Sequence, residues 1–178
     1  MRSRTPAEER YARVAVNDDP TTAPRPMPVP EALALVAEAP RGLLALGMPR
    51  CAACMLLPAS LLEIRRARPG LVVAIGEFAS IEDWAWREEL LWPRGINVSR
   101  SSVPALALLV DGAVVATRPG GGPAANIDRW LEGVLGPAPH PLGADPTPGE
   151  LAALDSLQGV IAGHRAVKGR RESSLGTA

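Results

Sequence analysis

Two short apolar runs on either side of a helical segment most constrain the fold of this 178-residue chain. Residues 41–47 (RGLLALG) and 71–78 (LVVAIGEF) have the composition of strands that are buried on both faces. Residues 51–68, between them, carry apolar side chains at helical spacing, and Pro58 is expected to kink this helix. A strand–helix–strand crossover of this kind requires the two strands to be parallel.

A second pair of apolar runs predicts a hairpin. Residues 103–110 and 113–118 flank Asp111-Gly112, a dipeptide typical of tight turns between antiparallel strands. A glycine-rich loop (PGGGP, 119–123) follows, and its glycines would let a substrate backbone come close.

Three further segments have helical patterns: residues 30–40, 80–92 and 124–136. One mixed β-sheet with helices on both faces accommodates the crossover and the hairpin, so we predict an α/β fold.

Composition divides the chain into four parts. Residues 1–27 are polar and contain several of the 19 prolines, so we expect a flexible N-terminal arm. Residues 28–136 hold the periodic segments and form the predicted domain. Residues 137–149 form a proline-rich linker, and residues 150–178 form an additional C-terminal helix and a flexible tail.

The charge balance argues against two classes of partner. Lys+Arg and Asp+Glu number 19 each, so the formal charge is zero, which disfavours nucleic acid and acidic membrane surfaces as partners. The sequence contains no run of 18 apolar residues, so we expect no transmembrane helix. The basic residues near the start are not followed by the apolar run of a secretory signal, so we expect a cytoplasmic protein.

The two cysteines of the chain, Cys51 and Cys54, lie in the stretch RCAACM. Structural disulfides are rare in the cytoplasm, so this spacing favours a redox dithiol or a metal site over a structural staple. Zinc usually requires four ligands, and His140 and His164 lie outside the predicted domain, so we expect no metal. Two cysteines with no chemical role remain an alternative.

The order of these elements resembles the thioredoxin fold over roughly residues 28–136. The features that carry the resemblance are Cys51-Ala-Ala-Cys54 at the start of a helix, Val103-Pro104 ahead of a strand, and the hairpin LLVDGAVVATRPGG followed by the helix IDRWLEGVL. The resemblance implies a thiol–disulfide oxidoreductase without a bound cofactor, in which Cys51 attacks a substrate disulfide and Cys54 resolves the mixed disulfide. It also implies a cis Pro104 beside the dithiol, with the backbone of Val103 free to pair with the substrate.

Several positions depart from thioredoxins. Arg50 stands where thioredoxins have tryptophan, and we expect its positive charge to favour the thiolate of Cys51. Thioredoxins also have a buried aspartate and a buried lysine behind the dithiol. Here the matching positions are Ala45 and Ile75, and Glu77 is a candidate substitute.

Three of the four tryptophans, Trp84, Trp86 and Trp92, lie in the predicted helix 80–92, which opens with Ser80 and Asp83 in a capping-box arrangement. Trp84 and Trp86 would point about 200° apart on an α-helix, so both cannot face one core. We therefore expect one of the three tryptophans on a partner-binding surface. Alternatively, the N-terminal arm or the C-terminal helix covers it.

Two functions are consistent with these features. The first is an oxidoreductase whose partners are proteins with a disulfide or a thiol. The second is a non-catalytic adaptor or maturation chaperone on the same scaffold, since some bacterial thioredoxin-fold proteins, including hydrogenase-assembly factors, hold partner proteins rather than turning over disulfides. The tryptophan-rich helix and the C-terminal helix (150–169) are the candidate partner-binding segments.

Overall fold

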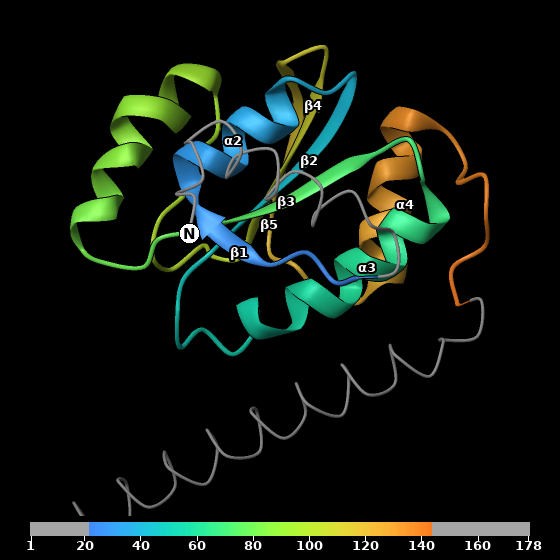
Figure 1. Cartoon of the computed structure of the whole chain (residues 1–178), viewed down its shortest axis with the longest axis horizontal. Helices are drawn as coiled ribbons and strands as arrows, with labels where there is room; N and C mark the ends of the chain where they lie inside the picture. Colours follow the sequence, from blue (N-terminus) through green and yellow to red (C-terminus); the bar gives the residue numbers. More distant parts are fainter. Residues whose placement is uncertain (1–21, 144–178) are drawn as a thin grey trace, which may run out of the picture. The chain divides into compact units, whose positions relative to one another are not determined.

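The computed structural model describes residues 22–143, which contain a five-stranded mixed sheet in the order β1-β3-β2-β4-β5 (Figure 1). The predicted α/β fold is therefore confirmed. The strands are β1 (Pro26–Pro28), β2 (Arg41–Gly47), β3 (Val72–Glu77), β4 (Ala105–Val110) and β5 (Ala113–Pro119).

The two predicted connections are both present. Strands β2 and β3 are parallel, and the helix α3 (Leu57–Ala67) lies between them in sequence. Strand β4 is antiparallel to β2 and to β5, and the β4–β5 turn is made by Asp111 and Gly112, both with positive φ. Positive φ at both central residues is the geometry that an Asp-Gly hairpin turn favours.

Helix α2 (Val29–Ala37) covers one face of the sheet. Its apolar side chains pack on β3 and β2 in what we call the α2-side cluster, built on Val29, Leu33, Val36, Leu44 and Leu46. Pro30 lies in the first turn of α2, where its missing N–H costs no helical hydrogen bond. The helix predicted at 30–40 is thus confirmed, with slightly different ends.

Helices α3 and α4 (Ala124–Leu135) cover the other face. They form the α3–α4 cluster, which comprises Leu57, Leu61, Ile64, Ile127 and Leu131 against Leu43 of β2 and Ile75 of β3. Each fully buried side chain of this kind stabilises the fold by about 1.5–3 kcal/mol. Strand β2 is buried on both faces because one cluster packs on each of its faces.

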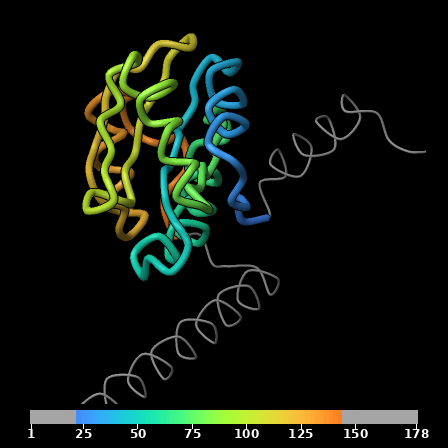
Figure 2. Tube along the Cα trace, turned by 90° about the vertical axis from the view of Figure 1, so that its left-hand side faces the viewer, coloured from blue at the N-terminus to red at the C-terminus, as the bar shows by residue number. Residues whose placement is uncertain are grey.

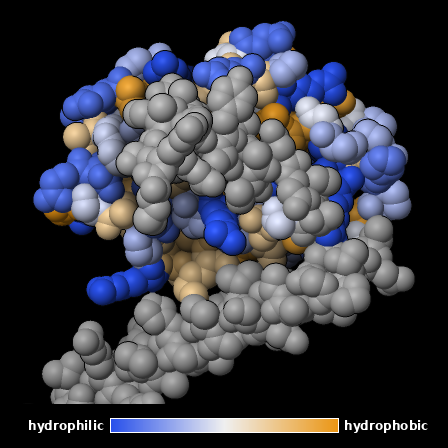
Figure 3. Space-filling model, in the orientation of Figure 1, coloured by the Kyte–Doolittle hydropathy of each residue, from blue (hydrophilic) through white to orange (hydrophobic). Residues whose placement is uncertain are grey.

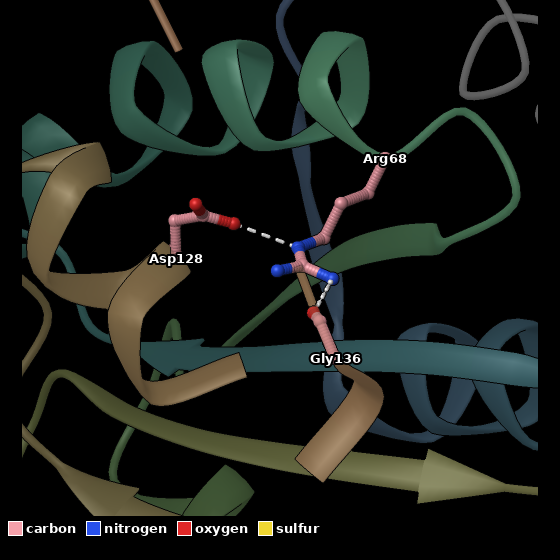
Figure 4. Close-up of polar contacts among 3 residues, drawn as sticks. All are labelled: Arg68, Asp128 and Gly136. Carbon is pink, nitrogen blue, oxygen red and sulfur yellow. Dashed lines mark hydrogen bonds and ion pairs between the residues drawn. The ribbon is translucent and has the colours of Figure 1, made fainter. Parts of the chain in front are cut away.

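A buried arginine joins the ends of α3 and α4 (Figure 4). Arg68, which follows α3 and is 5% exposed, donates from Nε to Asp128 Oδ1 at 2.7 Å and from Nη1 to the carbonyl of Gly136 at 3.0 Å. Asp128 is on α4 and Gly136 caps its C-terminus. The arginine therefore holds the two helices together at the end of α3 that is far from the cysteines.

Pro58 does not kink a helix, contrary to the sequence prediction. It lies in the first turn of α3, and a short 3₁₀ turn, η1 (Cys54–Leu56), precedes it. Proline favours this position because the first N–H groups of a helix have no intrahelical acceptor. The cysteines consequently lie on the turns that lead into α3.

The folded region begins before residue 28. Pro26 and Met27, which were expected in the flexible arm, belong to β1 and pair with Ile75 and Gly76 of β3. Proline is tolerated there because β1 is an edge strand. Residues 1–21 of the arm lie outside the described region.

The predicted linker is only partly described. Residues 137–143 contain neither helix nor strand, and the His140 N–H donates to the carbonyl of Ala67 at 3.2 Å. The rest of the linker and the predicted helix and tail at 150–178, including His164, lie outside the described region. Within residues 22–143, no helix has both the length and the apolarity needed to cross a membrane.

The predicted helix at 80–92 is a series of short helical turns. They are η2 (Glu82–Trp84), the π-helical η3 (Arg87–Leu91) and η4 (Trp92–Arg94). The expected capping box is present: the Ser80 N–H donates to Asp83 Oδ2 at 2.8 Å, and the Asp83 N–H donates to Ser80 Oγ at 3.4 Å. Pro93 has no N–H, so a regular α-helical ladder could not continue through it.

Candidate dithiol site

Cys51 and Cys54 form a disulfide where β2 turns into α3, with their Cα atoms 5.2 Å apart. This turn lies at one end of the fold in both Figure 1 and Figure 2 (cyan). Both cysteines are half-buried. The pair is therefore on a short turn with a strand end on one side and a helix start on the other.

The backbone of this turn points donors at the first cysteine. The Cys54 N–H lies 3.2 Å from Cys51 Sγ and also donates to the Cys51 carbonyl at 3.0 Å. The Met55 N–H donates to the same carbonyl at 3.2 Å. An N–H group beside a sulfur stabilises negative charge there once the disulfide is reduced.

Gly47, the last residue of β2, lies directly against the second cysteine. A Cβ at this position would be 3.2 Å from the Cβ of Cys54 and 3.4 Å from its Sγ. Cys54 also packs against the α3–α4 cluster. The Cys54 side chain is thus enclosed by the sheet end and the core.

Pro104 lies close to the start of α3. The peptide bond between Val103 and Pro104 is cis, and Pro104 is buried. A Cβ on Gly121 would come within 2.9 Å of Leu57 Cδ2 and 3.1 Å of Pro104 Cγ. One glycine therefore contacts both the proline and the first residue of α3, which follows the dithiol by three residues.

The glycine-rich loop is tied to both neighbours by hydrogen bonds. The Gly120 N–H donates to the carbonyl of Pro104 at 2.6 Å, and Ser60 Oγ of α3 donates to the carbonyl of Gly122 at 2.9 Å. The glycines of this loop were expected to let a substrate backbone come close. Its contact with Pro104 and α3 depends on the fold and has no signal in the sequence.

Arg50 is exposed and directly precedes Cys51. Its backbone is in the left-handed region, with a φ of 63°, which costs a residue other than glycine about 1–2 kcal/mol. In the described structure the Arg50 guanidinium has no hydrogen bond or ion pair that would hold it in one place.

The tryptophans have different environments. Trp84 stacks on Phe78, with ring centroids 4.2 Å apart, and both Trp84 and Trp86 pack against the α2-side cluster. The expectation that these two could not share one core is wrong, because the segment is not a regular α-helix. Trp92 is 45% exposed, with the Arg87 guanidinium 4.6 Å from its ring centroid.

Exposed hydrophobic side chains are spread over several elements. On the face shown in Figure 3, hydrophobic residues are interspersed with hydrophilic ones. The large exposed ones in the described region are Leu56, Ile81, Trp92, Val115 and Val134. Of these, Leu56 lies two residues beyond Cys54.

The two positions behind the dithiol are apolar. Ala45 and Ile75 are buried, in the α3–α4 cluster, and pair with each other across β2 and β3. Glu77 ends β3 and is half-buried, and burial raises the pKa of its carboxyl. Within residues 22–143, no group of three or more His, Cys, Asp or Glu side chains could hold a metal ion.

Comparison with known proteins places this geometry in a fold class. No family model matches the sequence, and no curated protein matches it. The solved structure of desulfothioredoxin from Desulfovibrio vulgaris Hildenborough matches with a TM-score of 0.50 and 17% identity over 64% of this chain and 99% of that one. The likeness shows that the chain has the thioredoxin fold.

Two further thioredoxins match at similar levels. Thioredoxin f2 from Chlamydomonas reinhardtii has a TM-score of 0.49 and 12% identity, over 64% of this chain and 98% of that one. Thioredoxin f from spinach chloroplast has a TM-score of 0.48 and 17% identity, over 70% and 90%.

Proposed function

We propose that the chain is a thiol–disulfide oxidoreductase that acts on protein disulfides through Cys51 and Cys54. The observation that carries this proposal is the cysteine pair at the entry to α3, with the Cys54 N–H 3.2 Å from Cys51 Sγ. A fold alone does not define an activity, so the proposed activity depends on the residues of the site.

Cys51 is the attacking residue in this proposal. Its sulfur receives a backbone donor, whereas Cys54 is packed against Gly47 and the α3–α4 cluster. In the reduced protein, the Cys51 thiolate attacks one sulfur of the substrate disulfide, and the first substrate thiolate leaves. Cys54 then loses its proton and attacks Cys51 Sγ, and the second substrate thiolate leaves. Two electrons pass from the dithiol to the substrate, and two protons end on its thiols.

Val103 and Pro104 are proposed to bind the substrate beside the dithiol. Support comes from the contact of Gly121 with both Pro104 and Leu57, which brings this loop to the start of α3. An extended substrate segment there would pair with the backbone of Val103. Arg50 is proposed to favour the thiolate of Cys51 through its charge.

Reduction of insulin disulfides tests the proposal. The reduced wild-type chain should accelerate the reaction, with dithiothreitol as the source of electrons, and Cys51→Ser should abolish the acceleration. Cys54→Ser should instead trap protein clients on Cys51 as mixed disulfides that a reductant releases. A wild-type chain no faster than dithiothreitol alone would refute the proposed activity.

A second candidate function is a non-catalytic adaptor. The exposed Trp92 and Ile81 and the apolar Ala45 and Ile75 favour it. Capture of a partner protein by a chain with both cysteines changed to serine, and its loss in Trp92→Ala, would support the adaptor.

The cytoplasmic location expected from the sequence stays a prediction.

A further inference from the structure

Glu77 lies on the face of the sheet that the dithiol occupies. Side chains alternate along a strand, and Val73 and Ile75 of β3 belong to the α3–α4 cluster whereas Ala74 belongs to the α2-side cluster. Glu77 therefore faces the α3–α4 side, like Ile75. Cys54 packs against the same cluster.

Glu77 is also the direct neighbour of Gly47 across the strands. The two residues pair in the parallel register of β2 and β3, and the Phe78 N–H donates to the carbonyl of Gly47 at 3.0 Å. Strands β2 and β3 therefore stay paired up to their last residues. Because Gly47 has no side chain, Cys54 fills the space beside Glu77: its Sγ is 3.4 Å from where a Cβ of Gly47 would be.

These positions put the carboxyl within reach of the sulfur. Neighbouring strands are about 4.8 Å apart, so Glu77 starts roughly one strand spacing from Gly47. Cys54 Sγ lies 3.4 Å from the position that a Cβ of Gly47 would take. Its two methylene groups can cover this distance, directly or with one water between the carboxylate and Sγ. The neighbours of Glu77 on this face of the two strands, Gly47 and Pro28, offer no competing polar side chain.

The surroundings of Glu77 are suited to proton transfer. The charged groups on the adjacent elements are Arg25 ahead of β1, Arg50 after β2, and Glu63, Arg65 and Arg66 on α3. Arg65 Nη1 donates to the carbonyl of Thr22 at 3.1 Å. Burial raises the pKa of Glu77, which moves this carboxyl toward the pH range in which a general base is effective.

We propose that Glu77 is the proton acceptor for Cys54 in the resolving step. This inference rests on the proposed oxidoreductase activity. In the mixed disulfide, the Cys54 S–H proton passes to the Glu77 carboxylate as Cys54 Sγ attacks Cys51 Sγ. The S–S bond to the substrate breaks, the substrate leaves as a thiolate, and the proton on Glu77 passes to that thiolate or to water.

Reaction of the reduced protein with Ellman's reagent separates the two steps. Attack by Cys51 releases the first equivalent of thionitrobenzoate, and resolution by Cys54 releases the second. We expect Glu77→Gln to slow the second phase at pH 7 by about tenfold or more and to leave the first phase unchanged. The difference should shrink toward high pH, where hydroxide removes the proton.

A second measurement does not depend on turnover. In Cys51→Ser protein the only thiol is Cys54, and its ionisation can be followed by thiolate absorbance at 240 nm. Glu77→Gln should move this titration to lower pH and raise the thiolate fraction at pH 8 by about threefold, because a neighbouring carboxylate disfavours the thiolate. A purely structural role would not produce a more ionised Cys54 together with a slower resolving step.

The matched control is Glu89→Gln, at an exposed carboxyl on η3. It should change neither the second phase nor the Cys54 titration. An unchanged second phase in Glu77→Gln, or an unshifted titration, would overturn the assignment while leaving the oxidoreductase activity in place. A wild-type chain that releases no second equivalent would instead refute the proposed function, and the titration alone would then decide whether Glu77 and Cys54 interact.

Discussion

Gly47 lies against Cys54, with the cysteine Cβ 3.2 Å and Sγ 3.4 Å from the position that a Cβ of Gly47 would take. A Cβ at this strand end would require the Cys54 side chain to shift by a few tenths of an ångström. The contact joins the last residue of a central strand to the turn that carries the candidate chemistry, so it should affect both stability and dithiol geometry.

Gly47→Val should destabilise the oxidised protein by about 1–3 kcal/mol, because an isopropyl group would be forced against a packed side chain. Urea unfolding monitored by tryptophan fluorescence measures this change. The control is Gly133→Ala on α4, where a Cβ would meet nothing within 4 Å and should stabilise the helix by about 0.5–1 kcal/mol. A Gly47→Val chain as stable as the wild type would show that this contact is loose.

Arg68→Ala should lower the free energy of unfolding by about 3 kcal/mol. The substitution leaves the Asp128 carboxylate and the Gly136 carbonyl without the donors that Arg68 provides, and it opens a gap between α3 and α4. Arg129→Ala, at an exposed residue of α4, should change stability by less than about 0.5 kcal/mol. Equal effects of the two substitutions would contradict the assigned role of Arg68.

Glu77 should make stability depend on pH. Burial raises its pKa in the folded protein above the usual 4.5, so between these two pKa values the folded state binds more protons than the unfolded state. Unfolding free energy should therefore fall as pH rises through this window, relative to Glu77→Gln, which has no titrating group there. Urea unfolding of both oxidised proteins from pH 4 to 8 measures the difference, and a constant difference would contradict a raised pKa.

Arg50→Ala should reduce the reactivity of Cys51. With Cys54→Ser as the background, iodoacetamide should alkylate the variant about two- to fivefold more slowly at pH 7, because the thiolate loses a neighbouring positive charge. The effect should decrease in 1 M salt, since Arg50 is exposed and its charge is screened. Arg94→Ala, at another exposed arginine, serves as the control. The same alkylation rate and pH profile with and without Arg50 would remove its assigned role.

Elements with a strong local pattern were predictable. The alternation of apolar runs indicated β2, β3, β4 and β5, and the Asp111-Gly112 turn and the Ser80–Asp83 capping box are both present in the structure. Each of these features depends on neighbours within a few residues, so its physical cause is written in the local sequence.

Elements without a local cause were missed. Strand β1 is three residues long and contains two prolines, and it exists because β3, about fifty residues later, offers an edge to pair with. The tryptophan segment was expected to be one α-helix, yet it changes helical type twice and turns Trp84 and Trp86 toward the same cluster. In both cases packing against distant residues outweighed the local pattern.

The order of the residues was enough to predict the mixed sheet and the position of the cysteine pair at a strand-to-helix turn. It also identified the residues around that pair. The approach of Gly47 to Cys54, of Gly121 to Pro104 and of Glu77 to the dithiol face depended on the folded chain. Local periodicity sets which segments become strands and helices, whereas strand register and helix packing set which side chains meet, and those contacts join residues that are far apart in sequence.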